Sequence, residues 1–184
     1  IATSLVPIIR GASLMLVGDP QQLNPVILLS QIDNRKLRKT YKITDEYDYI
    51  NNSIYKVFLA CDSVSREILL SHHYRCNDRI IQFNNKKYYN GKLKICNHSK
   101  ELHPLVFIDV PENKTYCKNT APMEVNQIIK YASMNKDKSI GVITPFANQK
   151  ELINQELKDN ELSNVSCGTV HAFQGDEKDV VLFS

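Results

Sequence analysis

The chain has 184 residues, and its 42% hydrophobic and 23% charged residues are typical of an ordinary soluble globular protein. This length allows one domain with its own core, or one domain and part of another. The net charge of +3 is too small to indicate nucleic-acid binding by itself, and no apolar run approaches the ~20 residues that span a bilayer, so no membrane partner is expected.

The N-terminal part of the chain is predicted to contain a helix and then a buried strand. Residues 1–10 have the pattern of the end of a helix, and residues 13–17 form a short apolar run that predicts the strand. Residues 31–49 are polar and tyrosine-rich without a clear period, which we interpret as an insertion or linker. Apolar residues then return at helical spacing over residues 50–61.

From Arg66 onwards, strand and helix patterns alternate. Helices are predicted after Asn77, which can act as an N-cap, after Pro122, and around Leu152 and Leu157. The predicted strands cover residues 67–70, 105–110, 140–144, 165–170 and 180–183. Short apolar strands that alternate with amphipathic helices predict an α/β fold in which a parallel sheet is flanked by helices.

In such folds, ligands gather at the carboxyl ends of the strands. Four polar segments follow predicted strands and are therefore candidate sites: residues 18–22, 73–75, 144–146 and 169–177. The first is Gly-Asp-Pro-Gln-Gln, whose two amides could orient a water or touch a phosphate, although Gly-Asp-Pro is also common in plain turns.

Two further segments contain side chains suited to anionic ligands. Arg75 precedes a predicted helix, and its planar guanidinium could form two bonds to a phosphate. A surface ion pair is the alternative, and His72 and His73 are interpreted as polar neighbours without a metal role. Thr144-Pro145-Phe146 suits backbone contact and base stacking on a single strand, unless Phe146 belongs to the core.

The fourth segment belongs to the run Gly-Thr-Val-His-Ala-Phe-Gln-Gly-Asp-Glu-Lys-Asp-Val-Val, which is unusually dense in polar groups. In this order and spacing, the four segments resemble superfamily 1 helicases, in the branch of the nonsense-mediated-decay helicase. Residues 18–23 resemble motif III and residues 73–76 resemble motif IV. Residues 144–146 are similar to the Thr-Pro-Tyr element, and residues 169–181 resemble motif V.

The resemblance implies a RecA-like P-loop NTPase fold and an ATP site. Gln22 would sense the γ-phosphate and couple it to nucleic acid, and Arg75 would contact the same phosphate. Gly175 and Glu177 would lie at the nucleotide, with Glu177 near the ribose.

The resemblance also implies a track for single-stranded DNA or RNA. Thr144, Pro145, Phe146, Thr169 and His171 would line this track. The sequence does not distinguish DNA from RNA, because backbone and stacking contacts tolerate both, although DNA is the expected substrate.

Two elements that the family needs for ATP and Mg²⁺ do not occur in this sequence. There is no G-x-x-x-x-G-K-[ST] motif, and no Asp-Glu pair precedes Gly18 at a strand end. With no initiator Met, the chain is expected to be part of a longer protein, whose upstream domain supplies most ligands of the metal. The 184-residue chain alone is expected not to hydrolyse ATP.

These observations favour one domain arrangement. Residues 1–30 are predicted to end the first RecA-like domain and carry motif III, residues 31–60 to connect, and residues 61–184 to form most of the second RecA-like domain. The first domain of the same polypeptide is therefore an expected partner. The expected activity is that of an ATP-dependent helicase, and the alternative is an inactive helicase-like module that binds nucleic acid.

The five cysteines indicate the expected compartment. Their number is odd and none forms a C-x-x-C pair, which argues against a disulfide framework or a zinc site. Free thiols fit a reducing cytoplasm.

Overall fold

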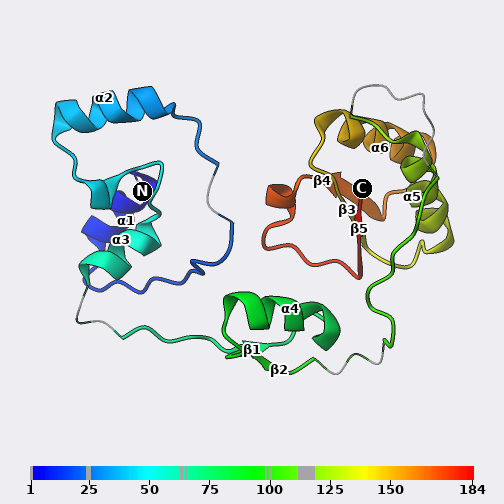
Figure 1. Ribbon diagram of the computed structural model, residues 1–184, viewed down its shortest axis with the longest axis horizontal. Helices are drawn as coiled ribbons and strands as arrows, with labels where there is room; N and C mark the ends of the chain where they lie inside the picture. Colours follow the sequence, from blue (N-terminus) through cyan, green and yellow to red (C-terminus); the bar gives the residue numbers. More distant parts are fainter. Residues whose placement is uncertain are drawn as a thin grey trace. The chain divides into compact units, whose positions relative to one another are not determined.

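The computed structural model describes residues 2–23, 26–62, 64, 66–97, 99, 101–111 and 119–184. The chain divides into two compact units, Ile1–Ser71 and His72–Ser184 (Figure 1). Cys61, Cys76, Cys96 and Cys167 are free thiols, and Cys117 lies outside the described residues. Among the described residues, no helix has the length and apolar character needed to cross a membrane.

The described part of the first unit consists of helices and connecting loops. In chain order these are α1 (Ala2–Arg10), α2 (Gln31–Tyr41), the short 3-10 helix η1 (Asp45–Tyr47) and α3 (Ile54–Cys61). The helices predicted at residues 1–10 and near residues 50–61 are therefore present, with α3 starting four residues later than its apolar spacing suggested.

Helix α2 occupies most of the segment that we interpreted as an irregular linker. Its start is fixed by Ser30, whose hydroxyl accepts a hydrogen bond from the Asp33 backbone N–H (3.1 Å) and donates one to the Asp33 carboxylate (2.7 Å). Its end is fixed by Lys42, which adopts the left-handed conformation with φ 52°. Capping residues and good helix formers thus outweigh the missing apolar stripe.

Three of the predicted strands are not regular strands in the structure. Residues 13–17, 67–70 and 105–110 are irregular, and their side chains are largely exposed: Val17 is 80% exposed and Phe107 is 90% exposed. A strand is stable only when a neighbouring strand completes its backbone hydrogen bonds. These runs lack such a ladder in the described structure, so their apolar residues remain accessible.

The second unit begins with a small β-α-β element. Strands β1 (His72–His73) and β2 (Lys94–Ile95) pair in parallel, with His72 opposite Lys94, and helix α4 (Asp78–Tyr88) lies between them in the sequence. The prediction that Asn77 caps this helix is confirmed, because its side chain accepts from the Arg79 backbone N–H at 3.0 Å.

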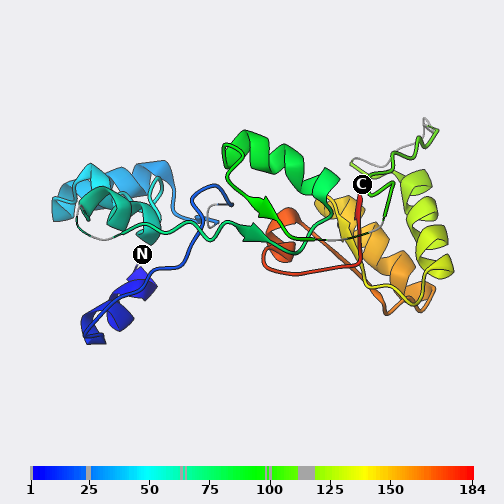
Figure 2. The same cartoon turned by 90° about the horizontal axis from the view of Figure 1, so that it is seen from below.

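The main sheet of the second unit has three parallel strands in the order β4-β3-β5 (Figure 1), and Figure 2 shows the same structure turned by 90°. Its elements are α5 (Pro122–Met134), β3 (Ile140–Ile143), α6 (Ala147–Asp159), β4 (Val165–Gly168), the 3-10 helix η2 (Val170–Phe173) and β5 (Val180–Phe183). The predicted α/β fold with parallel strands and flanking helices is confirmed. The strand predicted over residues 165–170 ends at Gly168, because η2 begins at Val170.

The core of the second unit lies between this sheet and the paired helices α5 and α6. It consists of buried side chains from both helices, from β3 and from the turn before β4: Val125, Ile128, Ala132, Ile140, Val142, Ile153, Leu157 and Leu162. Each large apolar side chain buried in this way contributes about 1.5–3 kcal/mol. This core fixes the carboxyl edge of the sheet, where two of the four candidate segments begin.

Candidate functional site

The strands β3, β4 and β5 end side by side. Ile143 pairs with both Gly168 and Phe183, so the residues that follow them leave the sheet at one edge. The Thr144 backbone N–H donates to the Gly168 carbonyl (3.1 Å), and the Ser184 N–H donates to the Ile143 carbonyl (3.0 Å). The loops after β3 and β4 are therefore neighbours, as the parallel sheet predicts.

A buried amide, which sequence reasoning missed, supports this edge. Gln149 of α6 is 2% exposed, and its Oε1 accepts from the Ala121 N–H (2.7 Å) while its Nε2 donates to Ser184 Oγ (2.8 Å). Ser184 Oγ in turn donates to Glu124 Oε2 at 2.6 Å. This network joins the start of α5, the first turn of α6 and the end of β5.

The loop after β3 presents a ring to solvent. Thr144 is fully buried, and its Oγ1 accepts a weak hydrogen bond from the Phe146 N–H (3.4 Å). Pro145 is exposed and Phe146 is 48% exposed, so Phe146 is not the core residue that the alternative interpretation required. Of these three predicted contacts to a strand, the structure leaves Pro145 and Phe146 accessible, whereas Thr144 faces inward and supports the loop.

The loop after β4 is held by an aromatic ring. A Cβ on Gly141 would lie 2.8 Å from the Phe173 ring, and one on Gly168 would lie 3.2 Å from it. The lack of side chains at these glycines therefore lets Phe173 of η2 lie against β3 and β4. This contact positions Thr169, which is partly buried, and His171, which is exposed.

The segment that leads into β5 is a polar turn. Gly175 has φ 85°, a conformation that favours glycine, and a Cβ there would meet open space. Asp176 accepts from the Glu177 N–H (2.9 Å) and forms an ion pair with Lys178 (3.2 Å), and the hydrogen bond from Lys178 lowers the pKa of Asp176. The Asp179 carboxylate accepts from both the N–H and the hydroxyl of Ser139, which anchors the end of the turn.

Two residues predicted to contact the nucleotide meet in the second unit. The Arg75 side chain, which follows β1, donates from Nε to Oε1 of Glu177. Their side chains are 56% and 65% exposed, so both remain accessible to a ligand. Two terminal nitrogens of the guanidinium also stay available to a phosphate, because the ion pair uses Nε.

The backbone at Arg75 is held by residues that sequence reasoning did not select. Asn97 Nδ2 donates to the carbonyls of Tyr74 (3.1 Å) and Arg75 (3.0 Å), and its Oδ1 accepts from the Ser99 N–H (2.7 Å). His73 Nε2 accepts from the Cys76 N–H at 2.9 Å, and burial lowers the pKa of His73, which favours this neutral acceptor form. In the sequence, Asn97 is recognisable only as an asparagine that follows β2, and nothing there indicates that it holds the Arg75 backbone.

Gln22 lies in the first unit, in a loop organised by Asp19. The Asp19 carboxylate accepts from the Gln21 N–H (2.9 Å) and from Gln22 Nε2 (3.1 Å). Gly18 faces the ring of Tyr55 on α3, since a Cβ there would lie 3.0 Å from that ring. Gln22 is exposed and is thus presented at the surface of its unit.

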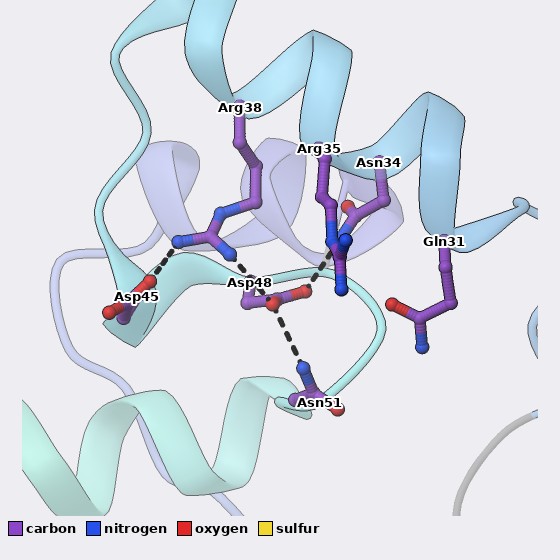
Figure 3. Close-up of a pocket in the computed structure, with 7 residues that line it drawn as sticks. All are labelled: Gln31, Asn34, Arg35, Arg38, Asp45, Asp48 and Asn51. Carbon is purple, nitrogen blue, oxygen red and sulfur yellow. Dashed lines mark hydrogen bonds and ion pairs between the residues drawn. The ribbon is translucent and has the colours of Figure 1, made fainter.

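A polar pocket in the first unit lies outside the predicted segments (Figure 3). Its lining residues come from α2 and the chain after it: Gln31, Asn34, Arg35, Arg38, Asp45, Asp48 and Asn51. Asp48 accepts from Asn34, Arg38 and Asn51, each at 2.9 Å, and the hydrogen bond from Asn34 contributes most to lowering the pKa of Asp48 to about 2. Because these groups largely bond one another, the pocket is a structural junction.

The described residues contain no dense cluster of metal-ligating side chains. Within them, no group of three or more His, Cys, Asp or Glu side chains lies close enough to hold a metal ion. Mg²⁺ prefers one or two carboxylates together with waters and substrate phosphates.

Comparison with known proteins identifies the family of this chain. The model of the AAA domain family AAA_12 matches residues 50–184. The chain belongs to this family. The range that matches the AAA_12 model includes Arg75, Glu177 and both loops at the carboxyl edge of the main sheet.

The relatives of this AAA_12 chain are helicases. It is 26% identical over 213 residues to "RNA helicase Mov10l1" of Mus musculus, which covers 100% of this chain and 18% of that protein. It is 28% identical to "DNA polymerase alpha-associated DNA helicase A" of Saccharomyces cerevisiae, over 92% of this chain and 30% of that protein. It is also 28% identical to "ATP-dependent helicase NAM7" of the same yeast, over 98% of this chain and 20% of that protein. The chain thus spans less than a third of these relatives. Together they identify it as a superfamily 1 helicase sequence, and no solved structure matches it significantly.

Proposed function

We propose that this chain is part of an ATP-dependent motor that moves along single-stranded nucleic acid and separates strands. The observation that carries the proposal is the contact between Arg75 and Glu177, because the helicase resemblance assigns these two residues to the phosphate and the ribose of one nucleotide. The helicase names of the relatives support the same function.

The nucleotide is proposed to bind at Gln22, Arg75, Gly175 and Glu177. Arg75 would stabilise the charge that develops on the transferred phosphoryl group, and Glu177 would accept from a ribose hydroxyl. Mg²⁺ supplies further charge neutralisation when it is bound with ATP. Gln22 would relate the state of the γ-phosphate to the strand.

The nucleic acid is proposed to lie over the loops that follow β3 and β4. Phe146 and Pro145 offer apolar surface for a base, and Thr169 and His171 offer hydrogen-bonding groups for the backbone. Thr144 would act by holding the loop, because its side chain is buried. DNA is the proposed substrate, and the relatives' names include both an RNA helicase and a DNA helicase.

The proposed domain arrangement has residues 1–30 in the first RecA-like domain and residues 61–184 in the second. Residues 31–60, which contain α2, would join them, although the first compact unit extends to Ser71. Relatives that are several times longer than this chain are consistent with a further domain in the same polypeptide.

The proposal is tested with the full-length protein by measuring ATP hydrolysis with and without single-stranded DNA or RNA. Strand-stimulated hydrolysis, together with unwinding of a tailed duplex, is expected. Strand binding without any hydrolysis would support instead a helicase-like module that only binds nucleic acid. The comparison of DNA with RNA identifies the substrate.

A further inference from the structure

Helix α4 and the turn after it carry a concentration of positive charge. From Arg79 to Lys94 the sequence has five basic residues and no acidic residue, together with three aromatic residues. In the described structure, none of the five basic side chains forms an ion pair. Their charge is therefore not neutralised by carboxylates of the described residues.

The exposed side chains of this region form what we term the α4 face: Phe83, Lys86, Lys87, Tyr88, Lys92 and Lys94. Lys87 Nζ lies 5.3 Å from the Phe83 ring centre and 5.5 Å from that of Tyr88. Phe83 is nevertheless 63% exposed and Tyr88 is 42% exposed. A cationic group and two aromatic rings thus lie together at an accessible surface, and the other lysines of this region are exposed nearby in the sequence.

The opposite side of α4 holds this face rigid. Ile81 and Asn85 are buried. Asn85 Nδ2 donates a hydrogen bond to the Leu93 carbonyl (3.1 Å), and Asn85 Oδ1 accepts one from the Leu93 N–H (2.9 Å). The Gly91 N–H also donates to the Asn85 carbonyl at 2.9 Å. The chain that carries Lys92 and Lys94 is consequently tied to the helix that carries Phe83.

We propose that the α4 face binds single-stranded nucleic acid as a second contact, separate in sequence from the loops after β3 and β4. Its charge is complementary to phosphates, and an exposed ring offers a stacking surface that only an unpaired base can use. An acidic peptide would engage the lysines but would make no use of the exposed part of the Phe83 ring. The inference rests on the proposed nucleic-acid function.

The test uses the full-length protein and a labelled oligothymidylate or oligouridylate, with affinity measured over a range of salt concentrations. Phe83→Leu keeps an apolar side chain but removes the ring, and we expect affinity to fall about tenfold, within the range of one lost stacking contact. Lys86→Ala with Lys87→Ala should reduce the slope of log affinity against log salt by about 1.4, the value for two phosphate contacts on a single strand.

Lys130→Ala with Lys158→Ala is the matched control, because it removes two exposed lysines from α5 and α6 and should change neither quantity nearly as much. Unchanged affinity and slope in the α4 variants would overturn the inference. If Phe146→Ala still weakened binding in that case, the proposed function would stand without the second contact. Failure of the wild-type protein to bind any strand would refute both. If Phe83→Leu impairs folding, the salt dependence of the Lys86→Ala with Lys87→Ala variant tests the inference.

Discussion

Arg75 and Glu177 are joined by a charge-assisted hydrogen bond although 102 residues separate them in the sequence. The bond connects the loop after β1 with the turn before β5. Both side chains are more than half exposed, and exposed pairs contribute about 0–1 kcal/mol to stability. The pair therefore contributes little to the stability of the fold. Because both side chains are exposed, both groups remain accessible to a ligand.

Glu177→Gln should weaken ATP binding with little change in stability. Hydrogen bonds to charged groups contribute roughly 1.5–3 kcal/mol, so we expect the KM for ATP to rise at least about tenfold while the melting temperature stays near that of wild type. Comparison of ATP with 2′-deoxy-ATP tests the ribose contact directly. The variant should discriminate between the two less than wild type does, and equal discrimination would place Glu177 away from the ribose.

Asn97→Ala should slow ATP turnover through the position of Arg75. Asn97 holds the carbonyls of Tyr74 and Arg75, and a displacement of about 1 Å in a catalytic group can cost on the order of 10²-fold in rate. We expect kcat to fall roughly tenfold to a hundredfold with KM nearly unchanged. Asn97→Asp keeps the acceptor for Ser99 but loses both donors, so it should be as slow. If the melting temperature fell together with kcat, the loss of activity would instead indicate that Asn97 is a purely structural residue.

Gln149→Ala should destabilise the second unit. The change removes the partners of the Ala121 N–H and of Ser184 in a buried setting, and a buried donor left without a partner costs about 1–3 kcal/mol. Gln155→Ala is the control on the same helix, since Gln155 is exposed and should change stability by less than about 0.5 kcal/mol. Denaturant unfolding of the two variants measures the difference, and equal stabilities would contradict the proposed network.

Asp48 should make the first unit less stable at low pH. Its pKa lies at about 2 in the folded chain against an ordinary value of 3.8, so its contribution is complete above pH 3.8 and is lost as the pH falls through 2. The melting temperature of wild type should therefore approach that of Asp48→Asn between pH 5 and pH 2. A constant difference between the two over this range would show that the Asp48 charge is not linked to folding.

The parts of the structure that follow from local pattern were predictable. The Asn77 cap and the helix at Pro122 depend on neighbouring residues, and the strands β3 and β5 are short apolar runs. The parallel order then brings the loops at Thr144 and Thr169 to one edge, so their proximity could be expected from topology alone.

The parts that depend on distant partners were not predictable. The apolar runs 13–17 and 105–110 resemble strands, but only pairing with another strand makes a ladder, and that pairing cannot be seen in a short run. Asn97 and Gln149 are ordinary polar residues in the sequence, and their importance arises from the carbonyl and N–H groups that the fold places beside them.

The most direct test of the account is the kcat of Arg75→Ala in the full-length protein at saturating ATP and single strand. Arginine contacts to a transferred phosphoryl group are worth roughly 10³–10⁵ in rate in other enzymes, and we expect a fall toward the lower value. Arg75→Lys should rescue little, because lysine lacks the planar fork. Melting temperature and strand affinity should stay near wild type. A kcat equal to that of wild type would remove Arg75 from the ATP site and contradict the account.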